Sequence, residues 1–132
     1  MTPTNLLTIG LVACCASLIG CERDVSFSRD VQPILTGSCL QCHDQAAEGE
    51  SNSGLALASY GDLLAGTRFG SVVVPGSRES SVLYQTIAGL TAPEIRMPPH
   101  HEESFAEGQG TPLTRAEIET IGAWIDQGAL DN

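Results

Sequence analysis

Five consecutive residues, Cys39-Leu40-Gln41-Cys42-His43, constrain this chain more than any other stretch. They have the C-x-x-C-H spacing that is typical of covalent haem attachment, in which each cysteine thiol adds to one vinyl group of the porphyrin. Cys39 and Cys42 are three residues apart, so one helical turn presents both sulfur atoms on the same side. His43 follows at once, and its imidazole can then reach the iron as the proximal ligand. The motif predicts one covalently bound haem c.

A C-x-x-C pair has two other common uses, in a zinc site and in a dithiol redox site. A structural zinc ion usually needs four ligands, and outside the motif the candidates are His100 and His101. Neighbouring side chains on an extended segment point to opposite sides, so this histidine pair would complete a tetrahedron poorly. A dithiol redox site is expected beside a βαβ pattern, and the sequence has none. Haem attachment is therefore the favoured interpretation.

Length and charge limit the kinds of partner. The chain has 132 residues, 42% of them apolar, which indicates one globular domain. Sixteen acidic residues against six basic ones give a formal charge of −10. This charge argues against nucleic acid and against anionic lipid surfaces. It would attract a basic docking face on a protein partner, although it could equally serve solubility alone.

The first twenty residues have the pattern of an export signal. An apolar stretch from Leu6 to Gly20 is too short to span a bilayer and matches the apolar region of a secretory signal, although no Lys or Arg precedes it. Leu18-Ile19-Gly20-Cys21 resembles a bacterial lipobox, which implies cleavage before Cys21 and lipidation of that cysteine. Secretion with cleavage nearby and an uncleaved anchor stay open. We expect a signal at 1–20, a tether at 21–26 and a folded domain at 27–132, located in the periplasm and anchored to a membrane.

The folded part reads as all-α, with short helices and long loops. Helices are expected after a Ser28 cap, over 59–66, after Ser80 or Ser81, and after Thr114, where T-x-x-E forms a capping box. Val72-Val73-Val74 is extended and has no obvious strand partner. The third helix is expected to carry Val82, Leu83, Ile87 and Leu90. Residues 92–112 form a long loop of the kind that is usually functional.

The sixth position of the iron decides what such a protein does. Once the signal is removed, the single methionine is Met97, in Arg96-Met97-Pro98-Pro99. The prolines favour an extended, stiff segment that could hold a thioether against iron, and His100 or His101 is the alternative ligand. Arg96 is expected to pair with a haem propionate or to face solvent. Trp124 is expected to pack in the core, with a hydrogen bond to a propionate as the lesser alternative.

Several segments together resemble a known family. These are residues 27–35, Cys39 to His43, Val74-Pro75-Gly76, Arg96 to Pro99, and the region from Leu113 to Ala129. They are similar to the planctomycete-type cytochrome c domain, a branch of the class I c-type cytochromes. The resemblance implies a small class I cytochrome c-like fold of about four short helices around one haem, with His43 and Met97 as axial ligands.

From these residues we expect a one-electron carrier that serves redox protein partners and is not itself an enzyme. The alternative is a haem sensor or a peroxidase-like enzyme whose sixth ligand can be displaced.

Overall fold

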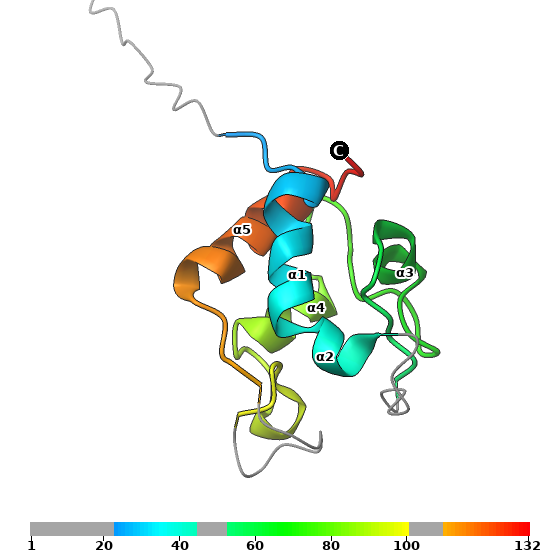
Figure 1. Ribbon diagram of the computed structural model, residues 1–132, viewed down its shortest axis with the longest axis vertical. Coiled ribbons are helices and arrows are strands. Elements are labelled where there is room, and N and C mark those ends of the chain that lie inside the picture. Colours follow the sequence, from blue (N-terminus) through cyan, green and yellow to red (C-terminus); the bar gives the residue numbers. More distant parts are fainter. Residues whose placement is uncertain (1–22, 45–52, 101–109) are drawn as a thin grey trace, which may run out of the picture.

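The computed structural model describes residues 23–44, 53–100 and 110–132, and all regular elements in these ranges are helical. The elements in chain order are η1 (Phe27–Val31, a π-helical turn), α1 (Gln32–Ser38), α2 (Leu40–His43), α3 (Tyr60–Ala65), α4 (Val82–Ile87), η2 (Pro93–Ile95, a 3-10 turn) and α5 (Arg115–Asp126). The all-α prediction is confirmed, and the haem motif forms a separate helix, α2, below the end of α1 (Figure 1). No helix in the described ranges is long and apolar enough to cross a bilayer.

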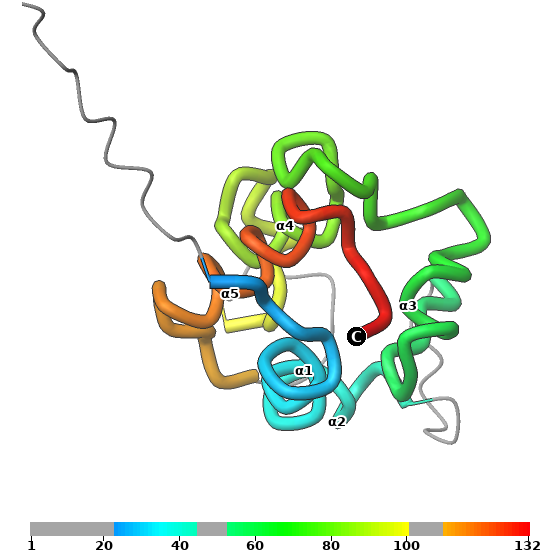
Figure 2. The backbone as a smooth tube through the Cα atoms, turned by 90° about the horizontal axis from the view of Figure 1, so that it is seen from above, coloured from blue at the N-terminus to red at the C-terminus, as the bar shows by residue number. Residues whose placement is uncertain are grey.

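The core lies where the N-terminal helical segment meets α5 (Figures 1 and 2). Three aromatic rings meet there: the centroid of Phe27 lies 5.2 Å from that of Tyr60 and 5.4 Å from that of Trp124. The Trp124 side chain is 1% exposed, and its indole Nε1–H donates to the Leu130 carbonyl at 2.9 Å. Trp124 is therefore a core residue, and its indole proton is already used within the protein.

The folded domain begins earlier than the sequence analysis placed it. Val25 and Ser26, assigned there to the tether, are buried. Ser26, not Ser28, caps the first turn, because its hydroxyl accepts a bond from the Arg29 N–H. The Ser28 hydroxyl donates instead to the Asn132 carbonyl at 2.8 Å. The start of the domain is thus bound to the last residues of the chain, a long-range contact that local capping rules cannot reveal.

Asp30 makes the stability of this junction depend on pH. Its carboxylate accepts a bond from the Ser26 N–H and pairs with Arg29 and Arg23, which together lower its pKa to about 2. A lowered pKa stabilises the folded state fully above the unfolded value of 3.8, and this stabilisation is lost as the pH falls towards 2. We expect the urea midpoint of the wild type to fall over that window. Asp30→Asn should be less stable than the wild type at pH 6 and should lose less stability between pH 4 and 2, where Glu117, whose pKa is also lowered, still titrates. A parallel fall in the variant would contradict this.

The middle helices match the sequence expectations in part. Helix α3 lies within the predicted range 59–66, and the Ser59 hydroxyl caps it by accepting a bond from the Asp62 N–H. Helix α4 follows Ser81 but ends at Ile87, so placing Leu90 in this helix was wrong. Gly89 has a φ of +69°, which turns the chain out of the helix, and Leu90 is 67% exposed. The segment 72–74 forms no strand, and the Val72 carbonyl accepts instead from the Leu83 N–H at 3.0 Å.

Helix α5 has the predicted capping box, in which Thr114 and Glu117 bond reciprocally. Further along α5, Glu119 and Asp126 bind Arg78 of the 74–81 turn. The Arg78 guanidinium lies 2.8 Å from Glu119 and also bonds Asp126 at 2.5 Å. These charged pairs span more than forty residues of sequence, so they fix the turn to α5.

The absence of a side chain at Gly122 lets Arg78 and Tyr84 pack closely against α5. A Cβ built on Gly122 would lie 2.7 Å from Arg78 Nη1 and 2.8 Å from the Tyr84 ring. Gly122→Ala should therefore cost about 1–3 kcal/mol in unfolding free energy, because both neighbours would have to move. Gly37, exposed in α1 with nothing within 4 Å of such a Cβ, is the matched control. Gly37→Ala should be neutral or gain up to about 1 kcal/mol. Equal effects of the two substitutions in chemical denaturation would contradict this account.

Candidate functional site

The C-x-x-C-H residues form one tight helical turn. The Cys42 and His43 N–H groups both bond the Cys39 carbonyl, at 3.1 and 3.0 Å. The Cys39 side chain packs against the hydrophobic core, whereas Cys42 is exposed. Burial, with a smaller contribution from Cys42, raises the pKa of the Cys39 thiol to about 11. Until haem is attached, the Cys39 thiol is therefore protonated at neutral pH.

His43 is oriented by a backbone group from a later segment. Its Nδ1 lies 3.0 Å from the Leu55 carbonyl, which can only accept a hydrogen bond, so Nδ1 carries the proton. The same segment is bound again through the Leu57 N–H, which donates to the His43 carbonyl at 2.9 Å. With Nδ1 occupied in this way, Nε2 is the nitrogen suited to bind a metal. Leu55 is a functional position that sequence reasoning missed, because a backbone carbonyl leaves no mark on residue type.

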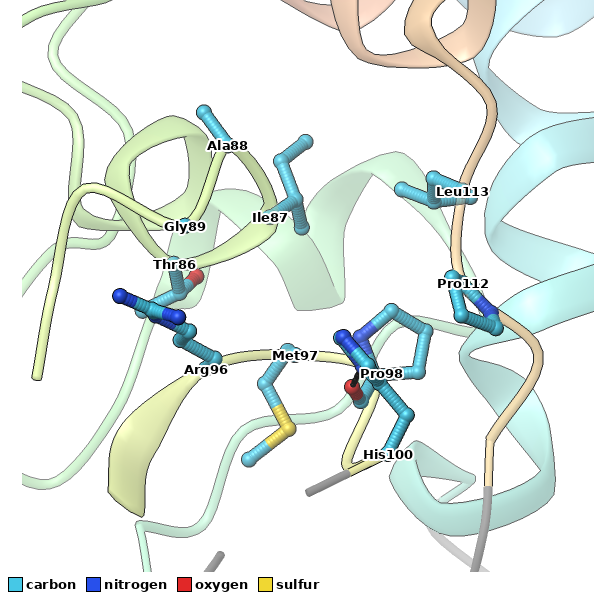
Figure 3. Close-up of a pocket in the computed structure, with 10 residues that line it drawn as sticks. All are labelled: Thr86, Ile87, Ala88, Gly89, Arg96, Met97, Pro98, His100, Pro112 and Leu113. Carbon is cyan, nitrogen blue, oxygen red and sulfur yellow. Dashed lines mark hydrogen bonds between the residues drawn. The ribbon is translucent and has the colours of Figure 1, made fainter. Parts of the chain in front are cut away.

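Met97 lies in a non-helical segment that is bound to α4. Its N–H donates to the Thr86 carbonyl at 3.3 Å, and its side chain is partly buried against the core. Met97 and His100 both line a cavity of about 210 Å³, together with residues of α4 and with Leu113 (Figure 3). The His100 Nδ1 lies 2.6 Å from the Pro98 carbonyl, so this ring is held beside the methionine.

The structure places the predicted ligands in two groups. Helix α2 and the segment that carries Met97 lie at the same end of the molecule in Figure 1. Neither the cysteines nor His43 lines the cavity beside Met97. The candidate residues His101 and Cys21 are outside the described residues.

The arrangement of potential metal-binding side chains also bears on whether the C-x-x-C pair could belong to a zinc site. In the ranges that the structure describes, no group of three or more His, Cys, Asp or Glu side chains could hold a metal ion. The two cysteines and one histidine of a single turn, with the histidine oriented through Nδ1, are instead the groups needed to attach a haem and bind its iron. The all-α fold and this turn define a c-type cytochrome domain.

Comparison with known proteins supports this class. Residues 39–101, a little under half of the chain, match the family described as planctomycete cytochrome C. Proteins with such a domain bind haem c covalently, which confirms the cofactor predicted from the motif.

One curated relative is hydrazine synthase subunit alpha of Kuenenia stuttgartiensis, 30% identical over 82% of this chain. A solved structure of Kuenenia stuttgartiensis hydrazine synthase matches 81% of this chain with a TM-score of 0.50 and 29% identity. In both cases the chain spans 16% of the length of the longer protein. The similarity thus covers one domain of an enzyme subunit, not the whole of it.

Arg96 lies next to the predicted distal ligand but points elsewhere. Its side chain is directed towards Gly89, whereas the Met97 thioether points away from that turn (Figure 3). Arg96 Nε–H donates to the Thr91 carbonyl at 3.1 Å, and the side chain is partly buried. Arg96 is thus partly buried, and its pairing with a haem propionate stays a prediction.

Proposed function

We propose that this protein is a mono-haem c-type cytochrome that carries one electron at a time between larger redox proteins. Haem c, when bound, supplies the iron couple that accepts and releases the electron. The observation that carries the proposal is the pair of ligand positions held by backbone bonds: His43 through the Leu55 carbonyl, and Met97 through the Thr86 carbonyl. Two strong axial ligands favour electron transfer, because they leave no coordination position for a substrate.

The chain's own residues would contribute position and environment. The bond from Nδ1 to Leu55 keeps the His43 imidazole in one tautomer and one orientation, so it need not reorganise when the charge on the iron changes. The short segment around Met97 contains two buried prolines, Pro98 and Pro99, which restrict its backbone. Little motion between the two oxidation states is what a fast carrier needs.

The test is carbon monoxide binding to the ferrous protein, together with a redox titration. A carrier with both axial positions filled should titrate as a single one-electron couple and should bind carbon monoxide weakly and slowly. Rapid, tight binding of carbon monoxide by the wild type would reject the carrier function.

A second function is supported by a specific observation. Met97 is only partly buried, it lines a cavity, and the relative in Kuenenia stuttgartiensis is an enzyme subunit. A sensor or peroxidase-like protein would use this space after Met97 leaves the iron. Turnover of hydrogen peroxide by the wild type, or ready binding of carbon monoxide, would favour this second function.

We also propose export and a lipid anchor at Cys21, with the protein facing the periplasm. This location agrees with haem c, because the resemblance to c-type cytochromes implies that the haem is attached outside the cytoplasm. Cys21→Ser should move the protein from the membrane to the soluble fraction of a haem-maturing host without changing its visible spectrum. A variant that stays in the membrane pellet would contradict lipidation at this residue.

The overall charge of −10 favours a redox partner with a basic docking face.

A further inference from the structure

The segment before Met97 is a closed turn fastened to the end of α4. Two backbone bonds shape the turn itself, from Ile95 N–H to the Ala92 carbonyl at 3.1 Å and from Arg96 N–H to the Pro93 carbonyl at 3.3 Å. The Met97 N–H then reaches back to the Thr86 carbonyl in the last turn of α4. The methionine is therefore the residue at which the turn meets the helix.

The Arg96 side chain joins the two ends of this turn. Arg96 Nε–H donates to the Thr91 carbonyl at 3.1 Å, which joins the residue before Met97 to the first residue of the turn. The Arg96 side chain lies against Gly89, where a built Cβ would be 3.8 Å from Nε (Figure 3). Among the described residues no carboxylate pairs with Arg96, unlike Arg23, Arg29 and Arg78. Among the described residues, the hydrogen bond from Arg96 Nε–H to the Thr91 carbonyl is the one bond that this side chain's guanidinium group makes.

The Arg96 and Met97 side chains point in opposite directions, and this suggests what the Arg96–Thr91 hydrogen bond does. Successive residues of a non-helical segment alternate, so a side chain fixed on one side sets the side on which its neighbour projects. Fixing Arg96 against Gly89 fixes the Met97 thioether on the other side, where Figure 3 shows it. The cation also lies beside the C-terminal end of α4, where a positive charge is stabilised.

We propose that Arg96 is a positioning residue for the distal ligand, holding the Met97 sulfur on the haem side by closing the 91–96 turn. The proposal rests on the proposed function, since it assumes that Met97 binds the iron. Arg96 itself touches neither the iron nor a substrate in this account.

The experiment compares Arg96→Gln with wild type, both matured with haem, by methionine–iron coordination and by carbon monoxide affinity. Loss of a bond from a charged donor should raise the fraction of molecules with displaced methionine by about tenfold. Since carbon monoxide competes with Met97, its apparent affinity for the ferrous protein should rise by the same factor of about ten. The red absorption band that reports methionine bound to ferric iron should weaken by the fraction of molecules in which methionine is displaced.

Three controls make the result specific. Arg115→Gln removes an equal charge from an exposed position at the start of α5 and should change neither readout. Thr91→Val removes a buried hydroxyl that has no hydrogen-bond partner among the described residues, but keeps the carbonyl that Arg96 uses, so methionine coordination should persist. Arg96→Lys keeps the charge and the stem without the planar donor group and should raise the carbon monoxide affinity by about threefold.

The outcomes separate this inference from the function on which it rests. A wild type without methionine–iron coordination overturns the proposed function. A wild type with it, and an Arg96→Gln protein no different from Arg115→Gln, overturns the role of Arg96. A lower thermal stability with unchanged coordination also overturns it, because that is a purely structural effect. If Arg96→Gln fails to fold, Arg96→Lys decides: an affinity equal to wild type contradicts the role, and a higher one supports it.

Discussion

Met97→Ala should convert a closed haem protein into one that binds carbon monoxide readily. Without the thioether the sixth position is left to water or an external ligand, and the ferrous affinity for carbon monoxide should rise by a factor of about 100 or more. The reduction potential should fall by on the order of 0.1 V, since axial ligands set haem potentials over a range of roughly 0.8 V and methionine raises them. Ligand titration and spectroelectrochemistry measure both effects.

His100→Ala is the matched control, because His100 lines the same cavity and was the rival ligand. It should leave the carbon monoxide affinity unchanged and move the potential far less than Met97→Ala does. The reverse result, a large change at His100 and little at Met97, would show that two histidines bind the iron.

The double variant Cys39→Ala, Cys42→Ala should lose its cooperative fold. The described core is small, with fourteen buried apolar residues and helices of four to twelve residues. Such short helices and so little core leave a domain of this size with little stability of its own, and a covalent haem would supply the missing apolar mass. Circular dichroism should show a weakened helical signal and no sharp thermal transition.

The wild-type chain produced without haem is the control for this variant and should behave in the same way. If only the double variant unfolds, the substitutions themselves are responsible. A sharp transition above about 50 °C in both haem-free proteins would show that the polypeptide core is sufficient alone.

Local signals predicted the parts of the fold that depend on local chemistry. The Thr114–Glu117 capping box lies where expected, because it is satisfied within one helical turn. The first cap was misplaced from Ser26 to Ser28, because the contact that recruits Ser28 comes from Asn132, more than a hundred residues away. Periodicity likewise extended α4 to Leu90, although Gly89 turns the chain before it.

In the candidate site, too, some features could be predicted from residue type and others needed the structure. From their chemistry and spacing, Cys39 and Cys42 could be proposed for haem attachment, and His43 and Met97 for binding the iron. The acceptors that orient them could not, because the Leu55 and Thr86 carbonyls belong to the backbone and would be the same for any residue. The direction of Arg96 also needed the structure, since its Thr91 partner is again a carbonyl.

The most direct test of the account is the intact mass and visible spectrum of the protein purified from a host that matures c-type cytochromes. We predict a red protein whose mass includes one haem, whose colour stays with the polypeptide in acidified acetone, and whose ferric spectrum reports methionine bound to iron. A colourless protein, or a pigment that passes into the acetone, would contradict the covalent attachment at Cys39 and Cys42 on which the proposed function depends.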